Sequence, residues 1–357
     1  MMIDGNRMMR AAVVHGKNDM RVEDVPLPDV PPGSIRVKVM SCAICGTDRR
    51  IFRVGDYRAE YPVITGHEIA GVVDAVSSGV GTVKEGDRVC VAPGHGCGKC
   101  RICLSGYPNV CTNPFPSLGY KVNGGFSEYM AVPENIFRLG FVNHIPGGLS
   151  FDQASMSEIV ACCLNAQENT PVREGDVVLV IGCGPAGLIH ATLSRMAGAK
   201  KVIVTQRSTD RLDMAKERFH LDRTVSSSRE DLDEAVSSET NGDGVDVVFV
   251  CAPSREAQET GLRLVAPRGR VNFFGGLPKD DCVVQLKANE IHYKEIFVGG
   301  ASSSLPAGNR KALELLSEKT IDPDRLITHR FVLDDIAEGF DVVESRRGIK
   351  VIINPWP

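Results

Sequence analysis

A glycine turn in the segment VLVIGCGPAGL constrains the fold of this chain more than any other feature. Gly182, Gly184 and Gly187 form a G-x-G-x-x-G pattern that directly follows an apolar strand and opens a helix. The first glycine permits a tight turn, the second lets the backbone approach a pyrophosphate, and the third allows close helix packing. A helix N-terminus also offers free amides to an anion. The turn, with Pro185 and Ala186, therefore predicts a dinucleotide-binding site.

Strand and helix patterns alternate around this turn. The segments DVVLVIG, KVIVTQ, VDVVFVCA and GRVNFFGG read as strands separated by one helix each, predicted at residues 185–198, 210–220 and 255–265. Strands connected in this way lie parallel, with right-handed crossovers. This context supports a ligand at the turn, and a glycine turn with no ligand is the alternative. The second half of the chain is therefore predicted to be α/β, with a doubly wound parallel sheet.

The first 150 residues show a different pattern. SIRVKVMSCAI, EIAGVVDAV, DRVCVAP and FSEYMAVP read as short strands, broken at short intervals by proline and glycine. This pattern predicts an antiparallel, barrel-like β domain. A length of 357 residues suits two domains.

Composition and charge limit the partners that the chain can have. Lysine and arginine total 41 against 45 acidic residues, so the net charge of −4 gives no overall attraction to nucleic acid or anionic membrane. The first 16 residues have no apolar core of a secretory signal, and no apolar run approaches about 20 residues. We expect a cytoplasmic protein without a nucleic-acid or membrane partner.

Four of the twelve cysteines lie within fifteen residues: Cys97, Cys100, Cys103 and Cys111. Four thiolates with these spacings can surround one ion and predict a closed, structural zinc site. Iron–sulfur clusters also use four thiolates, and a disulfide pair is a third alternative. The cysteines outside this cluster, apart from Cys45, lie mostly in apolar runs, where a thiol packs as a small hydrophobic group.

A second candidate metal site combines two separate segments, AICGTD with Cys45 and TGHEIAG with His67 and Glu68. Both follow strand-like segments at turns where side chains can converge. A catalytic zinc needs only three protein ligands, which leaves a position for water or substrate. The pairing therefore predicts an open zinc site, whereas ordinary core residues are the alternative.

Taken in order, CGTD, GHE, the four-cysteine lobe, GGFSEYM and GCGPAG resemble the zinc-dependent medium-chain alcohol and polyol dehydrogenases over essentially the whole chain. HGCGKCRICLSGYPNVC and SEIVACCLNA are most similar to the sorbitol or iditol dehydrogenase branch. The resemblance implies a GroES-like catalytic domain at residues 1–158 and 297–357, around an inserted Rossmann domain at residues 159–296. It also implies a homodimer or homotetramer.

The resemblance also implies roles for individual residues. Cys45 and His67 would ligate the catalytic zinc, Glu68 would be a direct ligand, and Glu158 would be a direct or water-mediated one. Glu158 could instead cap or brace its helix. Zinc lowers the pKa of a bound hydroxyl, and hydride then passes to a nicotinamide.

Two neighbours of Cys45 would assist this reaction. Thr47 would take the hydroxyl proton into a relay, or would simply bond its own turn. Asp48 is expected to brace the turn rather than to titrate.

Two segments depart from the sorbitol branch. In RRIFR, Arg50 and Ile51 stand where that branch has a histidine and a tyrosine, and GGASSSLPAGNR has serines where it commonly has an arginine. Arg50 could bind a phosphate or carboxylate of the substrate, contact the cofactor pyrophosphate, or be a solvated charge.

Sorbitol is therefore not assumed as the substrate. We expect a secondary alcohol or polyol, with an L-threonine-type amino alcohol or a polyol phosphate as alternatives. A non-catalytic binding protein on the same fold is the alternative of another class, which the complete set of ligands and glycines disfavours.

The segment KVIVTQRSTDR bears on the choice of cofactor. NAD-binding relatives end this strand with an acid that bonds the ribose hydroxyls and repels a 2′-phosphate. Gln206 removes the repulsion, and Arg207 adds donors suited to phosphate. Arg211 is a weaker signal, because an arginine there can stack on adenine. We expect NAD(P), with NADP favoured over the alternative of solvated polar side chains beside bound NAD.

Overall fold

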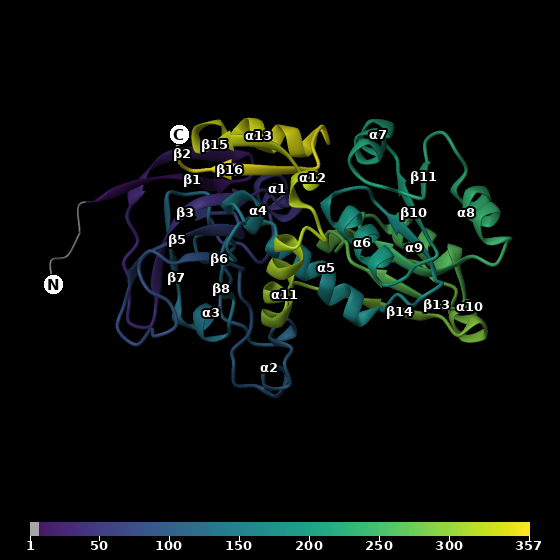
Figure 1. Ribbon diagram of the computed structural model, residues 1–357, viewed down its shortest axis with the longest axis horizontal. Coiled ribbons are helices and arrows are strands. Elements are labelled where there is room, and N and C mark those ends of the chain that lie inside the picture. Colours follow the sequence, from purple (N-terminus) through teal and green to yellow (C-terminus); the bar gives the residue numbers. More distant parts are fainter. Residues whose placement is uncertain (1–6) are drawn as a thin grey trace. The chain divides into compact units, whose positions relative to one another are not determined.

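The computed structural model describes residues 7–357. Residues 1–6 lie outside the described residues. They are part of the segment predicted to lack a secretory signal and of the predicted first domain. The described chain forms two compact units (Figure 1): the first comprises the part up to Ala161 together with Ser304–Pro357, and the second comprises Cys162–Ser303.

The second unit is built on a parallel sheet of six strands in the order β11-β10-β9-β12-β13-β14. Apolar runs such as VVLVI are buried because helices cover both faces of such a sheet. This is the doubly wound arrangement predicted from the alternating pattern. The strands are β9 (Val177–Ile181), β10 (Lys201–Gln206), β11 (Arg223–Ser226), β12 (Val245–Val250), β13 (Val265–Phe273) and β14 (Phe297–Gly300).

Helices α6, α7 and α9 begin and end within two residues of the predicted ranges, whereas α10 was not predicted. A strand and a helix that the sequence analysis did not identify, β11 and α8, follow α7 in a polar stretch with weak periodicity. The helices are α6 (Pro185–Met196), α7 (Thr209–Arg218), α8 (Leu232–Thr240), α9 (Arg255–Leu264) and α10 (Ala288–Lys294).

The first unit contains the predicted antiparallel β structure. A sheet of seven strands includes the path β15-β16-β3-β5-β6-β8, with β7 paired to β3, and a smaller sheet has the order β2-β1-β4. The strands are β1 (Met8–Gly16), β2 (Asp19–Pro26), β3 (Ile35–Ala43), β4 (Val63–Ile64), β5 (Glu68–Val76), β6 (Arg88–Val91), β7 (Tyr129–Val132), β8 (Val142–His144), β15 (Ile327–Val332) and β16 (Lys350–Asn354).

Short helices connect these strands. The segment after residue 150 forms two helices, α4 and α5, and α5 continues past Ala161 into the second unit. The helices are α1 (Gly46–Arg53), α2 (Arg101–Leu104), α3 (Glu134–Arg138), α4 (Phe151–Ser155), α5 (Ser157–Asn169), α11 (Pro306–Ser317), α12 (Pro323–Leu326) and α13 (Ile336–Glu344).

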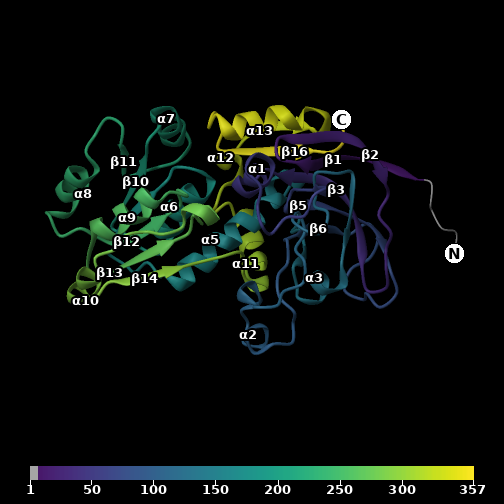
Figure 2. The same ribbon diagram turned by 180° about the vertical axis from the view of Figure 1, so that it is seen from behind.

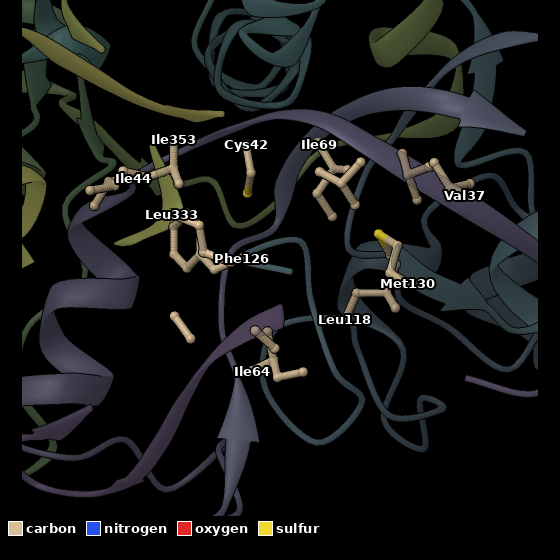
Figure 3. Close-up of a cluster of buried hydrophobic side chains, with 14 of the residues drawn as sticks. Val37, Cys42, Ile44, Ile64, Ile69, Leu118, Phe126, Met130, Leu333 and Ile353 are labelled. Atoms are coloured by element: carbon tan, nitrogen blue, oxygen red, sulfur yellow. The ribbon is translucent and has the colours of Figure 1, made fainter. Parts of the chain in front are cut away.

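The C-terminal segment belongs to the core of the first unit. Helix α13 lies along β15 and β16 (Figure 2), and Phe340 of α13 packs edge-on against Phe52 and Phe126 at ring distances of 5.5 and 6.0 Å. Figure 3 shows Phe126 among side chains from the N-terminal strands and from Ile353 of β16. Burial of this shared apolar surface joins segments about 300 residues apart.

None of the helices in the described part of the chain is long and apolar enough to cross a membrane.

Candidate metal and cofactor sites

Strand pairing brings the two halves of the predicted open zinc site together. Strands β3 and β5 are antiparallel with Ala43 opposite Glu68, so Cys45 and His67 lie just beyond the same end of the pair. One ligand atom from each of Cys45, His67 and Glu68 lies within 4.8 Å of the others. A soft sulfur, an imidazole nitrogen and a carboxylate oxygen are donors that zinc accepts.

Asp48 braces both turns that carry these donors, as expected from the sequence. Its buried carboxylate accepts hydrogen bonds from the backbone N–H of Cys45 at 2.8 Å and of Gly66 at 3.0 Å. It also lies 3.2 Å from Nδ1 of His67. Burial would raise the pKa of Asp48, but the adjacent His67 lowers it below its ordinary value. An ionised Asp48 holds Nδ1 protonated, which leaves Nε2 of His67 as the metal donor.

Glu68 has a partner that the sequence analysis missed. Nζ of Lys350, the first residue of β16, lies 2.6 Å from Oε1 and 2.5 Å from Oε2 of Glu68. Both side chains are buried. Burial would lower the pKa of Lys350, but Glu68, Cys45 and Glu158 raise it above its ordinary value. The only signal in the sequence was a lysine at the start of the apolar run KVIIN.

Glu158 and Thr47 occupy different positions around this site. Glu158 is buried in the first turn of α5 and lies close enough to Lys350 to raise its pKa, but it is not in the group of three donors. The hydroxyl of Thr47 makes no hydrogen bond to any residue in the range 7–357, so the local turn bond considered for it is not formed.

The four cysteines of the predicted closed site come together around α2. Their sulfur atoms all lie within 4.8 Å of one another, with Cys97 and Cys103 3.9 Å apart and Cys100 and Cys111 3.7 Å apart. Zn–S bonds of about 2.3 Å place tetrahedral sulfurs about 3.8 Å apart, so the spacing fits one zinc ion. Backbone N–H groups of Lys99 and Cys100 lower the pKa of Cys97 to about 6, which favours the thiolate.

All twelve cysteines, each within the described range, are free thiols. The alternative of a disulfide pair in the four-cysteine lobe is therefore not supported.

The glycine turn has the geometry that its pattern predicted. Gly182 has φ +115°, and a Cβ on Gly187 would lie 1.8 Å from the carbonyl oxygen of Gly182. Gly184 is the N-cap of α6, and Pro185 and Ala186 form the first turn of that helix. These glycines keep the backbone open at a helix N-terminus, which is the geometry that binds a pyrophosphate in dinucleotide-binding folds.

The end of β10 lies against this turn. Oε1 of Gln206 accepts a hydrogen bond of 3.1 Å from the backbone N–H of Cys183. Nη1 of Arg211 would lie 3.9 Å from a Cβ on Gly184, so Arg211 also reaches the turn. Arg207 is exposed, and its side chain makes no hydrogen bond or ion pair within the described residues.

Comparison with known proteins identifies the family. The Alcohol dehydrogenase GroES-like domain matches residues 31–140, and the Zinc-binding dehydrogenase domain matches residues 185–318. A sorbitol dehydrogenase of Halalkalibacterium halodurans is 33% identical, covering 96% of this chain and 97% of the relative. The chain belongs to the zinc-dependent medium-chain alcohol and polyol dehydrogenases.

Two further members of this dehydrogenase family are similar over nearly their full lengths. An L-threonine 3-dehydrogenase of Bacillus subtilis is 32% identical, covering 93% of this chain and 94% of the relative. The structure of a putative zinc-binding dehydrogenase from Sinorhizobium meliloti, bound to NADP, superposes with a TM-score of 0.89 at 32% identity and covers 98% of this chain and 100% of that chain. Family membership confirms the predicted GroES-like and Rossmann folds and the predicted cofactors, zinc and NAD(P).

A hollow of about 560 Å³ lies elsewhere in the first unit of this dehydrogenase. It is formed largely by the proline-rich stretch 28–34 and by residues 133–138, and none of the predicted site residues lines it.

Proposed function

We propose that this chain oxidises a secondary alcohol or polyol at Cys45 and His67, with transfer of hydride to NADP or NAD, or catalyses the reverse reaction. The observation that carries the proposal is the convergence of the Cys45, His67 and Glu68 donors. Thr47, two residues after Cys45, has a hydroxyl without a hydrogen-bond partner within residues 7–357. The four-cysteine lobe would hold a second, structural zinc.

The residues of the chain would prepare the substrate for this step. A zinc ion at Cys45 and His67 would supply Lewis-acid polarisation of the substrate oxygen, and a nicotinamide would supply the hydride acceptor. Asp48 fixes the His67 tautomer, so the imidazole presents Nε2. Oγ1 of Thr47 would receive the hydroxyl proton.

Glu68 and Glu158 are the two candidates for the third metal ligand. Lys350 contacts both oxygens of Glu68, so the carboxylate that lies near Cys45 and His67 is already paired with a cation. We propose that Glu158 supplies the third ligand, directly or through water, while Glu68 stays paired with Lys350. Direct ligation by Glu68 would need the Lys350 contact to break.

A spectrophotometric screen tests the proposed function. Zinc-loaded protein is expected to reduce NADP or NAD with at least one member of a panel of polyols, diols, hydroxy amino acids and polyol phosphates. Absence of turnover across that panel with both cofactors would favour the non-catalytic binding protein instead. The panel also separates the polyol, amino-alcohol and polyol-phosphate substrates that the family comparisons leave open.

Replacement of Gln206 by aspartate is expected to lower the kcat/KM ratio of NADP to NAD at least about tenfold, or about 1.4 kcal/mol. The reason is that a carboxylate beside Cys183 would repel a 2′-phosphate and still bond ribose hydroxyls. Gln206→Asn is the matched control, since it shortens the side chain without adding charge. A parent enzyme that prefers NAD more than about tenfold would contradict the NADP preference.

We propose that the protein is a homodimer or homotetramer that associates through β14. This strand is at an edge of its sheet and exposes Phe297 and Val298, and unpaired edge strands favour association. Phe297→Lys is expected to yield monomers in light scattering. Met196→Lys, at an exposed apolar position on α6 of the same unit, should leave the oligomer intact. An unchanged mass for Phe297→Lys would refute this interface.

The domain boundaries at residues 1–158, 159–296 and 297–357 and the cytoplasmic location remain predictions.

A further inference from the structure

A tyrosine and an arginine extend the first unit's metal-binding site on one side. The ring of Tyr120 lies 5.6 Å from the ring of His67, and the guanidinium carbon of Arg58 lies 5.0 Å from the centre of the Tyr120 ring. The Tyr120 hydroxyl makes no hydrogen bond within the described residues. Tyr120 therefore lies next to both His67 and Arg58.

Arg58 is held in this position by a buried carboxylate. Nε and Nη2 of Arg58 donate to the two oxygens of Asp56 at 2.9 and 2.8 Å, and the backbone N–H of Arg58 donates to Oδ1 at 3.0 Å. Only 3% of the Asp56 side chain is exposed, against 41% for Arg58. The Nη1 group of Arg58 has no partner in the described chain. The two-point contact orients the guanidinium and leaves its outer donors available.

A second arginine gives this group an excess of positive charge. Nε of Arg50 donates to Oδ2 of Asp56 at 2.8 Å, so one carboxylate serves two guanidinium groups. Burial would raise the pKa of Asp56, but Arg58 and Arg50 lower it to about 2, which keeps it ionised. The half-buried Arg49, on the same helix, has no side-chain partner within residues 7–357. The positive charge is thus only partly neutralised by the protein.

We propose that Arg58, which shares Asp56 with Arg50 and lies over the Tyr120 ring, binds a terminal oxyanion of the substrate. The substrate class would then be anionic polyols, meaning sugar acids with a carboxylate or polyols with a phosphate monoester. The Tyr120 ring lies next to both His67 and the guanidinium. An acyclic substrate whose hydroxyl is held at Cys45 and His67 would therefore direct its far end along Tyr120 toward Arg58, and arginine donors pair with either oxyanion. This inference rests on the proposed dehydrogenase function and names its substrate class.

The test compares a matched substrate set on the zinc-loaded enzyme: a neutral polyol, its terminal phosphate ester and its terminal carboxylic acid. One of the two anions is expected to exceed the neutral polyol in kcat/KM by about 30-fold or more, and comparison of the two identifies the group. In Arg58→Gln, the ratio of that anion to the neutral polyol should fall about 30-fold, with partial rescue in Arg58→Lys. Arg53→Gln is the matched control, because Arg53 on α1 pairs with Glu344 instead, and its ratio should match the parent.

A second variant controls for a loss of folding in Arg58→Gln. Arg58→Gln leaves the buried Asp56 with one arginine, whereas the double variant Asp56→Asn/Arg58→Gln removes the unpaired charge and should show the same loss of anion preference. Calorimetric titration of the zinc-loaded protein with the carboxylate and the phosphate ester measures binding without turnover. Arg58→Gln should raise the Kd of the preferred anion about 30-fold.

The possible outcomes separate the two proposals. A parent that prefers the neutral polyol, or an Arg58→Gln variant that keeps the anion preference, overturns the inference and leaves the dehydrogenase function intact. Absence of turnover on all three substrates with both cofactors counts against the proposed function. In that case the calorimetric titration tests the anion site by itself. An anion Kd that is equal in the parent and in Arg58→Gln would overturn the proposal that Arg58 binds the substrate oxyanion.

Discussion

Cys45→Ala is expected to lower kcat/KM by at least about a thousandfold, or about 4 kcal/mol, and to leave one zinc ion per chain. The thiolate is the only sulfur among the three donors at the open site, and without it His67 and a carboxylate hold the ion weakly. Elemental analysis and steady-state kinetics on the same preparation measure both effects. The four-cysteine site should keep its zinc, because its donors are separate.

Cys42→Ala provides the matched control for this prediction. Cys42 lies three residues earlier, is fully buried, and has a pKa raised well above its ordinary value by burial, so it remains a neutral thiol. Two zinc ions per chain and nearly parental activity are expected for this variant. Retention of two zinc ions in Cys45→Ala would show that Cys45 is not a ligand.

Lys350→Met is expected to destabilise the metal-free protein by about 3 to 5 kcal/mol. Removal of one partner of a buried ion pair leaves the other charge unpaired, and Glu68 has no exposed surface. Thermal unfolding of the metal-free protein measures the loss. Added zinc should restore part of the stability, because the released Glu68 carboxylate can then reach the metal.

The same variant tests which carboxylate is the third ligand. If Lys350 keeps Glu68 away from the metal, Lys350→Met should bind zinc more tightly but turn over more slowly, since Glu68 fills the position meant for substrate. Cobalt substitution and its visible absorption report the change in coordination. The neutral double variant Glu68→Gln/Lys350→Met should recover stability without this spectral change. An unchanged cobalt spectrum in Lys350→Met would contradict the competition.

Several features of the sites could be predicted because they depend on residues close in sequence. The four-cysteine lobe spans fifteen residues, and its sulfur spacing follows from short loops around α2. The glycine turn also lies within six residues, and the close approach of Gly187 to Gly182 is a property of that turn. Local patterns of this kind specify local geometry whatever the rest of the chain does.

The surroundings of Glu68 could not be predicted in the same way. Lys350 is 282 residues away in sequence and reaches Glu68 because β16 pairs with β3, which in turn pairs with β5. Hydrophobic patterning identifies KVIIN as a strand but does not say which strand it will pair with. A buried lysine in such a strand therefore gives no sign of its partner.

The sequence by itself determined the chemistry available to this protein: the thiols and imidazole that can hold metal, the glycines at a helix N-terminus, and the loss of an acid at the end of β10. Tertiary structure alone decided how these groups are used. It paired Glu68 with Lys350, placed Asp48 against His67, and set Arg58 over Tyr120 beside the metal donors. The physical reason is that charges and hydrogen bonds act over a few ångströms, and only strand pairing and core burial bring these distant residues within that range.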